Sequence, residues 1–341
     1  MSSSRSEGCT LTGALSITTA VRDTITIIHG PRGCAHHNFS LFHTVAMDRG
    51  RTAPRIFSTM ITEKDVVFGG EEALEQAIRR AVRLKPEVIF VLTSCVADTI
   101  GDDAAIVCRE AWPVPVMYIP TSGFLGGGFH NGERNALLSL ATIAQPEERA
   151  GREPAGVTLV GEKNLEYEVD QNYSEIVRLL SLLGEDVRLR FVRDIGARDI
   201  GLLGSGSLNV LRETGLSPVG EALEERYGTP FIPSFPLGLD GTLAFLEEVA
   251  GVSGNPVETA LEREKSRQRV LVDEFKDIRG KPVRLEGMPE PGERDAVNEL
   301  VDRFDLTLDE RGIRLPLPSP FPAGTSGVRH VLHRWRARIR A

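Results

Sequence analysis

Short runs of apolar residues alternate with amphipathic segments along the first part of the chain. The runs lie at residues 24–28, 56–60, 88–92 and 116–119. Each is rich in β-branched and other apolar side chains and ends in a turn or a polar loop, as a buried parallel strand does. Residues 71–84 place apolar side chains three or four positions apart, which indicates an amphipathic helix that Pro86 ends. This alternation predicts a Rossmann-like α/β domain over residues 1–150.

The alternation starts again after residues 145–156, a stretch rich in Pro, Glu and Gly that is typical of a linker. The elements predicted beyond it are strands at 157–160, 186–191 and near residue 231, and helices at 173–183, 219–227, 256–278 and 328–339. We therefore expect the fold class α/β, with tandem doubly wound parallel-sheet domains over 1–150 and 151–255. A long helix and a small third domain should occupy residues 256–341.

The composition narrows the class of protein further. Of 341 residues, 41% are hydrophobic and 6% aromatic, with 34 Gly and 20 Pro, which suits an α/β protein with many short turns and excludes a disordered or fibrous chain. The net charge is -8, and no basic stripe indicates nucleic acid binding. The longest apolar run is far too short to cross a bilayer, and residues 1–8 lack a signal-peptide core. We therefore expect a cytoplasmic protein that binds no membrane.

Three of the four cysteines follow a glycine or a serine where a strand or loop gives way to a helix. These are Cys9, Cys34 and Cys95. Cys34 should lie at a helix N-terminus, which lowers the pKa of a thiol and favours the thiolate that binds metal. Cys95 follows the apolar run 88–92, and ligand sites of open α/β sheets lie at the carboxyl ends of such strands. Rigidly placed thiolates of this kind are the soft ligands that an iron-sulfur cluster requires.

Two other interpretations of the cysteines remain open at this point. Free cysteine is among the most buried residue types and often behaves as a small apolar side chain. We expect this role for Cys108, which lies within a predicted helix on its apolar side. A zinc site is the other possibility, but the sequence contains neither a C-x-x-C nor an H-x-x-x-H pairing that would support one.

Histidines near Cys34 suggest acid-base chemistry. His36, His37 and His43 follow this cysteine on one predicted helix, and a neutral imidazole there could donate a proton to a substrate or ligate a metal. We take His36 and His37 as the candidate catalytic residues. The alternative is that these histidines are ordinary polar residues of a helix or an interface.

Glycine turns and acidic loops complete the set of candidates. Gly33 lets the backbone approach a cofactor, and the loop at 123–128, with Gly126 and Gly127, could bind carboxylates through backbone amides or serve only as a flexible turn. A general acid would belong among the acidic residues of the predicted loops, although most of these should be helix caps or solvated charges. The acidic residues concerned are Glu63, Asp65, Asp98, Asp102 and Asp103.

Several ordered motifs resemble a known family. They are Cys-Thr-Leu-Thr-Gly-Ala at 9–14, His-Gly-Pro-Arg-Gly-Cys-Ala at 29–35, the segment 58–71 ending in Val-Phe-Gly-Gly-Glu, Leu-Thr-Ser-Cys-Val at 92–96 and Ile-Gly-Asp-Asp at 100–103. Together they resemble the nitrogenase component 1 superfamily, which covers nitrogenase, its cofactor scaffolds, dark-operative protochlorophyllide reductase and a nickel-sirohydrochlorin reductive cyclase. The resemblance is strong over residues 9–140 and weaker through 227–242 and the tail.

This resemblance implies that Cys9, Cys34 and Cys95 are ligands of a 4Fe-4S cluster at a subunit interface. It also implies a homodimer that receives electrons from an ATP-hydrolysing iron-sulfur reductase. The chain has no G-x-x-x-x-G-K-S/T phosphate loop, so the partner would bind the ATP and Mg. No cysteine follows Cys108, which argues against a molybdenum-iron cofactor site, and the third domain is shortened relative to nitrogenase.

Among family members the chain most resembles the catalytic subunit of nickel-sirohydrochlorin a,c-diamide reductive cyclase. That resemblance implies the reduction and cyclisation of a nickel tetrapyrrole in factor 430 biosynthesis for methanogenesis. One alternative is a reductase of another substrate, such as a protochlorophyllide-like tetrapyrrole or an alkyl thioether. Another is a non-catalytic scaffold on which a metallocofactor is assembled.

Overall fold

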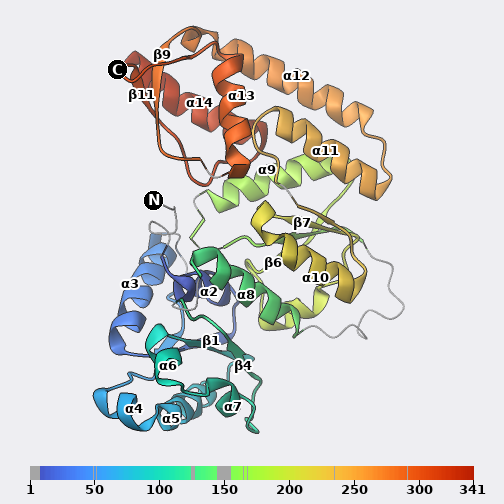
Figure 1. Cartoon of the computed structure of the whole chain (residues 1–341). Helices are drawn as coiled ribbons and strands as arrows, with labels where there is room; N and C mark the ends of the chain where they lie inside the picture. The colour runs from blue at the N-terminus through green and yellow to red at the C-terminus, as the bar shows by residue number, and fades with distance from the viewer. Residues whose placement is uncertain are drawn as a thin grey trace.

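Three parallel β-sheets, each covered by helices, follow one another along the chain (Figure 1). The computed structural model describes residues 8–341 except 49, 51, 124–126, 144–154, 164, 167, 234 and 290. Figure 1 shows the N-terminal unit at the bottom, the second in the middle and the C-terminal unit at the top. Every strand pair within these sheets is parallel. The predicted α/β class with tandem doubly wound sheets is confirmed.

The first sheet carries the strand order β2-β1-β3-β4. Its strands are β1 (Thr24–His29), β2 (Ile56–Ser58), β3 (Val88–Thr93) and β4 (Val116–Ile119). Its two central strands are buried on both faces, which explains their continuous apolar runs. One face packs against α5 (Glu71–Val82) and α7 (Ala104–Cys108), and the other against α2 (Thr10–Thr18), α3 (Arg32–Asp48) and α8 (Phe129–Ala141).

The second sheet has the order β6-β5-β7-β8. Its elements are β5 (Val157–Val160), α9 (Val169–Ser181), β6 (Val187–Phe191), η2 (Ala197–Leu202), β7 (Leu208–Leu211), η3 (Thr214–Leu216), α10 (Ser217–Tyr227), β8 (Phe231–Ile232) and α11 (Asp240–Ser253). Neither β7 nor α11 is evident from the sequence pattern. Asn209 interrupts the apolar run of β7 directly after a glycine turn, and α11 contains two glycines, which weaken a helical pattern.

The third unit is a small sheet of order β10-β9-β11 against three helices. Its elements are α12 (Glu258–Glu274), η4 (Lys276–Ile278), β9 (Pro282–Glu286), η5 (Pro291–Glu293), α13 (Arg294–Arg303), β10 (Thr307–Leu308), β11 (Ile313–Pro316) and α14 (Gly324–Arg340). The predicted helix 256–278 is wrong at its end, because α12 stops at Glu274 and a separate 3-10 turn follows. The fully buried Trp335 of α14 anchors this core.

The segments between the strands of the first sheet differ from the prediction in two places. Residues 62–70, for which the sequence predicts a loop, contain a short helix, α4 (Glu63–Phe68), which starts at a capping box between Thr62 and Asp65. The sequence also predicts a helix that Asp102 or Asp103 caps and that runs through residue 111; Asp103 does cap α7, but α7 ends at Cys108, and a separate helix, α6 (Cys95–Ile100), precedes it. Cys108 is buried in the core, as expected.

The proposed division at residue 150 falls outside the described residues, and both domain boundaries stay predictions. Among the helices that the structure describes, none combines the length and the apolar character needed to cross a membrane.

Candidate functional site

Three helix N-termini bring the cysteines toward one edge of the first sheet. Cys9 is the N-cap of α2, Cys34 lies in the first turn of α3, and Cys95 opens α6. Strands β1 and β3, which precede the second and third of these cysteines, are neighbours in the sheet. Helix α3, which follows β1, packs on one face of the sheet, and α7, which follows β3, packs on the other face. The carboxyl ends of β1 and β3 therefore form the topological switch point, where open α/β sheets bind ligands.

A chain of polar contacts joins the first two cysteines. The Sγ atom of Cys9 lies 3.6 Å from Oγ1 of Thr12, and this hydroxyl donates to Oδ1 of Asn38 at 2.9 Å. The side-chain amide of Asn38 in turn donates to the carbonyl oxygen of Cys34 at 2.8 Å. The buried bridge therefore fixes α2 relative to α3 and holds the two cysteines in place.

Cys95 and the residue after Cys9 both lie beside Gly123, in the loop that precedes α8. A Cβ atom added to Gly123 would lie 3.6 Å from Sγ of Cys95 and 3.5 Å from Oγ1 of Thr10, the residue after Cys9. Thr10 Oγ1 is buried, and no described residue forms a hydrogen bond with it. An unpartnered hydroxyl beside cysteines fits a site whose sulfur atoms can accept a hydrogen bond.

The electrostatics of the site differ from the sequence-based expectation. Burial raises the pKa of Cys34 above its ordinary value, and the nearby Cys9 and Cys95 raise it further. The helix N-terminus therefore does not dominate the pKa of Cys34, because burial disfavours the charged thiolate and the two neighbouring cysteines disfavour it further. The coupling nevertheless places the three thiols within electrostatic range. Their sulfur atoms are not all within 4.8 Å of one another, so among the described residues these three do not form a preformed site for a single metal ion.

Close packing of two glycines sets the position of Cys9 and of α8. A Cβ atom on Gly13 of α2 would lie 1.9 Å from the carbonyl oxygen of Phe129, and one on Gly132 of α8 would lie 1.8 Å from that of Thr10. Only glycine permits such an approach of two backbones. The sequence analysis did not identify this contact.

The predicted cofactor-binding glycines have different surroundings. A Cβ atom on Gly33 would meet nothing within 4 Å, so packing does not require a glycine there. Gly127 lies beside Thr10 and Asn131, each 3.3 Å from an added Cβ atom. Gly126 lies outside the described residues. The steric role belongs instead to Gly30, where an added Cβ atom would lie 2.3 Å from Oγ of Ser94.

A buried histidine behind the cysteines escaped the sequence analysis. Nε2 of His29, the last residue of β1, lies 3.0 Å from Oδ2 of Asp102, and Nδ1 lies 3.2 Å from Oγ1 of Thr59. The other carboxylate oxygen of Asp102 accepts from the backbone N–H of Gly70 at 2.9 Å. This network joins four loops at the edge that carries Cys34 and Cys95. Asp103, and not Asp102, caps α7.

Replacing Asp102 by Asn should destabilise the fold by about 1–3 kcal/mol, because a buried partner of His29 loses its charge. Burial lowers the pKa of His29, and Asp102, Glu71 and Asp98 oppose this effect only in part. Stability should therefore fall as the pH drops below about 6.5, the ordinary value for histidine, since the unfolded chain then binds the proton more readily. The variant should extend this fall to lower pH. Urea unfolding at several pH values measures both effects.

The matched control for this prediction is Asp103→Asn. It removes the charge of the neighbouring carboxylate and keeps a side-chain oxygen that can cap α7, because Asn caps a helix about as well as Asp, so stability and its pH dependence should change little. Superimposable pH profiles for the wild type and Asp102→Asn would contradict the predicted role of the pair.

The predicted catalytic histidines lie on the surface of α3. His36 and His37 are both exposed, and His43 is half-buried with its ring 5.6 Å from that of Phe39. His36 lines a cavity of about 530 Å³ together with Phe39 and Met60. The catalytic role of His36 and His37 stays a prediction.

A larger cavity, of about 640 Å³, lies where the three units meet. His130 of α8, Lys163 and Glu166 after β5, and Arg212 and Glu213 after β7 line one side. Residues of α11, η5 and α13 line the other. Ligand sites are common in cavities between domains.

One group of side chains beside this cavity has the spacing of metal ligands, but the ammonium group of Lys163 already pairs with it. Ligand atoms of His130, Glu133 and Glu213 lie within 4.8 Å of one another. Nζ of Lys163 lies 3.1 Å from Glu133 and 3.6 Å from Glu213. Burial alone would lower the pKa of Lys163, but these carboxylates raise it well above its usual range. The ammonium group therefore neutralises the cluster.

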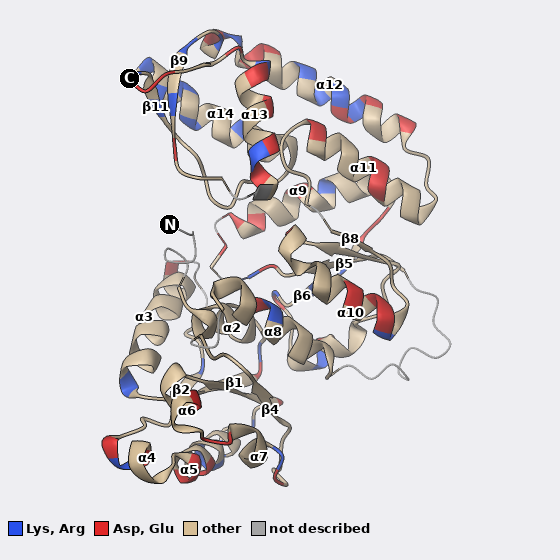
Figure 2. Cartoon of the chain, in the orientation of Figure 1, with Lys and Arg blue, Asp and Glu red and all other residues tan. Residues whose placement is uncertain are grey.

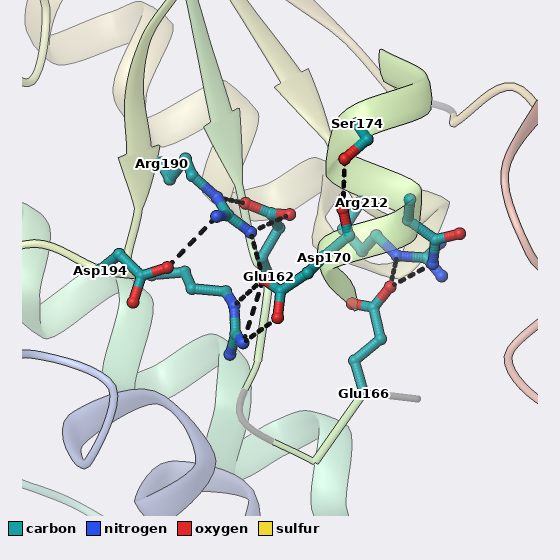
Figure 3. Close-up of polar contacts among 9 residues, drawn as sticks. Glu162, Glu166, Asp170, Ser174, Arg190, Asp194 and Arg212 are labelled. Atoms are coloured by element: carbon teal, nitrogen blue, oxygen red, sulfur yellow. Dashed lines mark hydrogen bonds and ion pairs between the residues drawn. The ribbon is translucent and has the colours of Figure 1, made fainter. Parts of the chain in front are cut away.

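Further charged side chains pair within and just after the strands of the second sheet (Figure 3), where Glu162, Glu166 and Arg212 are buried and Arg190, in β6, is half-buried. Arg190 binds Glu162 through two hydrogen bonds of 2.7 and 3.0 Å, and it lies over the ring of Tyr173. Arg212 donates to Glu166 at 2.6 Å. The sequence analysis missed these pairs, because charges that follow a predicted strand resemble solvated loop residues until the fold shows their burial.

Comparisons with known proteins agree with this architecture. A family profile described as nitrogenase component 1 type oxidoreductase matches residues 9–290. The nitrogenase iron-molybdenum cofactor biosynthesis protein NifE of Clostridium pasteurianum is 29% identical over 276 residues, 79% of this chain and 58% of that protein. The nitrogenase molybdenum-iron protein alpha chain of Methanococcus maripaludis is 25% identical over 285 residues, 77% of this chain and 58% of that protein.

Solved structures show the same fold. The structure "Nitrogenase Cp1 at pH 6.5" matches with a TM-score of 0.70 at 23% identity, and the match covers 89% of this chain and 60% of that one. The chain thus spans about three fifths of the length of the relatives that it matches.

Proposed function

Because the chain belongs to the nitrogenase component 1 type oxidoreductase family, we propose that it is an iron-sulfur component that passes electrons from an ATP-dependent reductase to a small molecule. One observation carries this proposal: Cys9, Cys34 and Cys95 converge from three separate helix starts at the switch point of the first sheet. A 4Fe-4S cluster bound there would supply one-electron transfer. The proposed setting is the reducing cytoplasm, where thiols stay available.

The residues around the cysteines have definite tasks within this proposal. The bridge through Thr12 and Asn38 holds Cys9 and Cys34 at a fixed separation. Thr10 offers an unused hydroxyl donor to a sulfur atom. His36 and His37 remain the candidate proton donors, since both are exposed beside the same first turn of α3. Gly33 and Gly127 keep the backbone open to the cofactor.

A second copy of the chain is the proposed partner in a homodimer. Three cysteines of one chain leave a cluster one thiolate short of the usual four ligands. Cys9 is exposed, so a ligand from another subunit can approach the same edge.

The proposed surface for the reductase lies next to Cys95. Helix α4 packs on α6, which this cysteine opens, and it exposes Val67 to 72% and Phe68 to 79% together with Met60 and Val66. An apolar group of this kind on a folded surface marks an interaction site.

Phe68→Asp should weaken ATP-dependent reduction by the reductase about tenfold or more, because a charge replaces an exposed aromatic anchor. Reduction by dithionite, which needs no docking, should be unchanged. The matched control is Ile106→Asp on α7, another exposed apolar residue outside the group. Equal loss with both reductants would show that Phe68 serves the fold and not the docking.

The substrate is the finer part of the proposal. The cavity of about 640 Å³ is large enough for an organic cofactor or substrate. Its described lining contains more acidic than basic residues, which is unfavourable for a polycarboxylate such as nickel-sirohydrochlorin a,c-diamide. Reduction of that tetrapyrrole in factor 430 biosynthesis therefore stays a prediction from sequence resemblance, as do a protochlorophyllide-like tetrapyrrole and an alkyl thioether.

A scaffold for metallocofactor assembly is the second candidate function. The observation that favours it is the set of NifE relatives, which are named as cofactor biosynthesis proteins. A reductase should consume electrons with substrate, reductase and ATP. A scaffold should instead release its cluster to an acceptor protein without turnover.

The experiment that tests the main proposal is anaerobic purification followed by iron and sulfide analysis and electron paramagnetic resonance of the reduced protein. We expect iron and sulfide in equal amounts and a signal typical of a reduced cluster. A colourless protein without iron would refute the proposal.

A further inference from the structure

The cavity of about 530 Å³ lies at the open edge of the first sheet. Among the described strands β2 pairs only with β1, so β2 is the edge strand. Helices α3 and α5 pack on opposite faces of this sheet, and both contact β2, which lies between them in Figure 2. Because residues of both helices and residues 56–60 line the cavity, it lies beyond the edge strand, between the two helices.

Two arginines line this cavity from different helices. Arg32 opens α3 and Arg80 belongs to α5. Both side chains are exposed, and neither guanidinium group forms an ion pair or a hydrogen bond with a described residue. The described lining contains no aspartate or glutamate, and its remaining titratable residue is His36. Two accessible guanidinium groups without a competing carboxylate favour an anion, and above all a carboxylate, whose geometry matches their own.

The rest of the lining is largely apolar. Phe39 and Met60 are exposed, and Ile56 and Phe57 of β2 are half-buried. Met60 has a φ of 56°, a left-handed conformation that is unfavourable for a side chain of this size, and such strain is concentrated at ligand sites. An aromatic ring suits these neighbours, because it can stack on phenylalanine, contact a methionine sulfur and lie against a guanidinium group. The lining therefore favours an anion that carries an aromatic ring.

We propose that this cavity binds a small aromatic carboxylate, with its carboxylate toward Arg32 and Arg80 and its ring against Phe39 and Met60. A volume of about 530 Å³ is within the range of small-molecule sites. The site goes beyond the proposed function, because its recognition of a ligand requires neither a cluster nor a reductase.

Four probes test the charge and the ring of the ligand on the unmodified full-length protein. They are 4-phenylbutyrate, 4-phenylbutanol, 4-phenylbutylamine and 4-cyclohexylbutyrate, and isothermal titration calorimetry or saturation-transfer NMR measures their binding. 4-Phenylbutyrate should bind about tenfold or more tightly than the alcohol and the amine, because only its charge complements the arginines. It should also bind several-fold more tightly than the cyclohexyl compound. Equal or tighter binding of any other probe, or no binding of 4-phenylbutyrate, would overturn the inference.

Arg80→Gln tests the arginine that lies outside the helices with the cysteines. Glutamine keeps a hydrogen-bond donor but loses the charge, so the affinity for 4-phenylbutyrate should fall about tenfold, and the affinity for 4-phenylbutanol should not change. Arg109→Gln is the matched control, because Arg109 is an exposed arginine at the end of α7 and is not part of the described lining. An equal effect of the two substitutions on the binding of 4-phenylbutyrate would contradict the assignment.

Phe39→Ala tests the position of the ring. The substitution removes an exposed aromatic wall of the cavity, so 4-phenylbutyrate should bind several-fold more weakly. Unchanged affinity would show that the ring lies elsewhere and would overturn this part of the inference. Because none of these measurements needs a cluster, their outcome is independent of the iron and sulfide analysis that tests the proposed function.

Discussion

Cys34→Ser should remove essentially all cluster iron and sulfide and abolish the electron paramagnetic resonance signal of the reduced protein. Cys34 lies near both of the other cysteines, since Cys9 and Cys95 each raise its pKa. A serine hydroxyl ionises far less readily than a thiol and is a poor ligand for iron in a sulfur-rich site. Within the proposed function, loss of Cys34 would leave two thiolates on one chain, too few to retain a cluster.

Cys108→Ser is the matched control for this experiment. Burial raises the pKa of the Cys108 thiol to about 12, and the residue packs in the apolar core between α5, α7 and the first sheet. Its substitution should cost some stability but leave iron, sulfide and the signal unchanged. Loss of the cluster with Cys108→Ser, together with its retention in Cys34→Ser, would overturn the assignment of the ligands.

Gly132→Ala should destabilise the protein by about 3 kcal/mol or more, the upper end of the cost of overpacking. The new methyl group would lie 1.8 Å from the carbonyl oxygen of Thr10, and both atoms belong to helix backbones that cannot rotate away. The only relief is to move α8 away from α2. Because α2 starts at Cys9, we also expect a lower iron content in the folded fraction. Urea unfolding and iron analysis of the same preparation measure both effects.

Gly251→Ala is the control for this second prediction. Gly251 also lies in a helix, α11, but an added Cβ atom would meet nothing within 4 Å. Alanine there should stabilise the protein by about 0.5–1 kcal/mol, because it restricts the unfolded chain and favours the helix. If the two variants had similar stability, the close packing of α2 and α8 would not be a determinant of the fold.

The central strands β1 and β3 of the first sheet could be predicted because both of their faces are buried, so that each is a continuous apolar run. The run at β4 matches its predicted limits, whereas β7 was missed because Asn209 lies within it. Burial of this asparagine depends on the neighbouring segments, where its amide donates to the carbonyl oxygen of Thr229. No local pattern contains that information.

The same distinction applies to the candidate site. The placement of Cys9, Cys34 and Cys95 at helix starts follows from local turn residues and could be predicted. The role of His29 could not, because its partner Asp102 lies 73 residues away and reaches it only through the order of the strands. The side of the large cavity that α11 lines could not be predicted either, because the sequence pattern does not reveal this helix.

The contact between Gly13 and Gly132 has a consequence for communication within the molecule. The backbones of α2 and α8 touch at these two glycines, so a shift of one helix should also shift the other (Figure 1). Cys9 lies at the start of α2, and His130, which lines the large cavity, lies at the start of α8. A displacement of α8 by a molecule in the cavity should therefore also move Cys9.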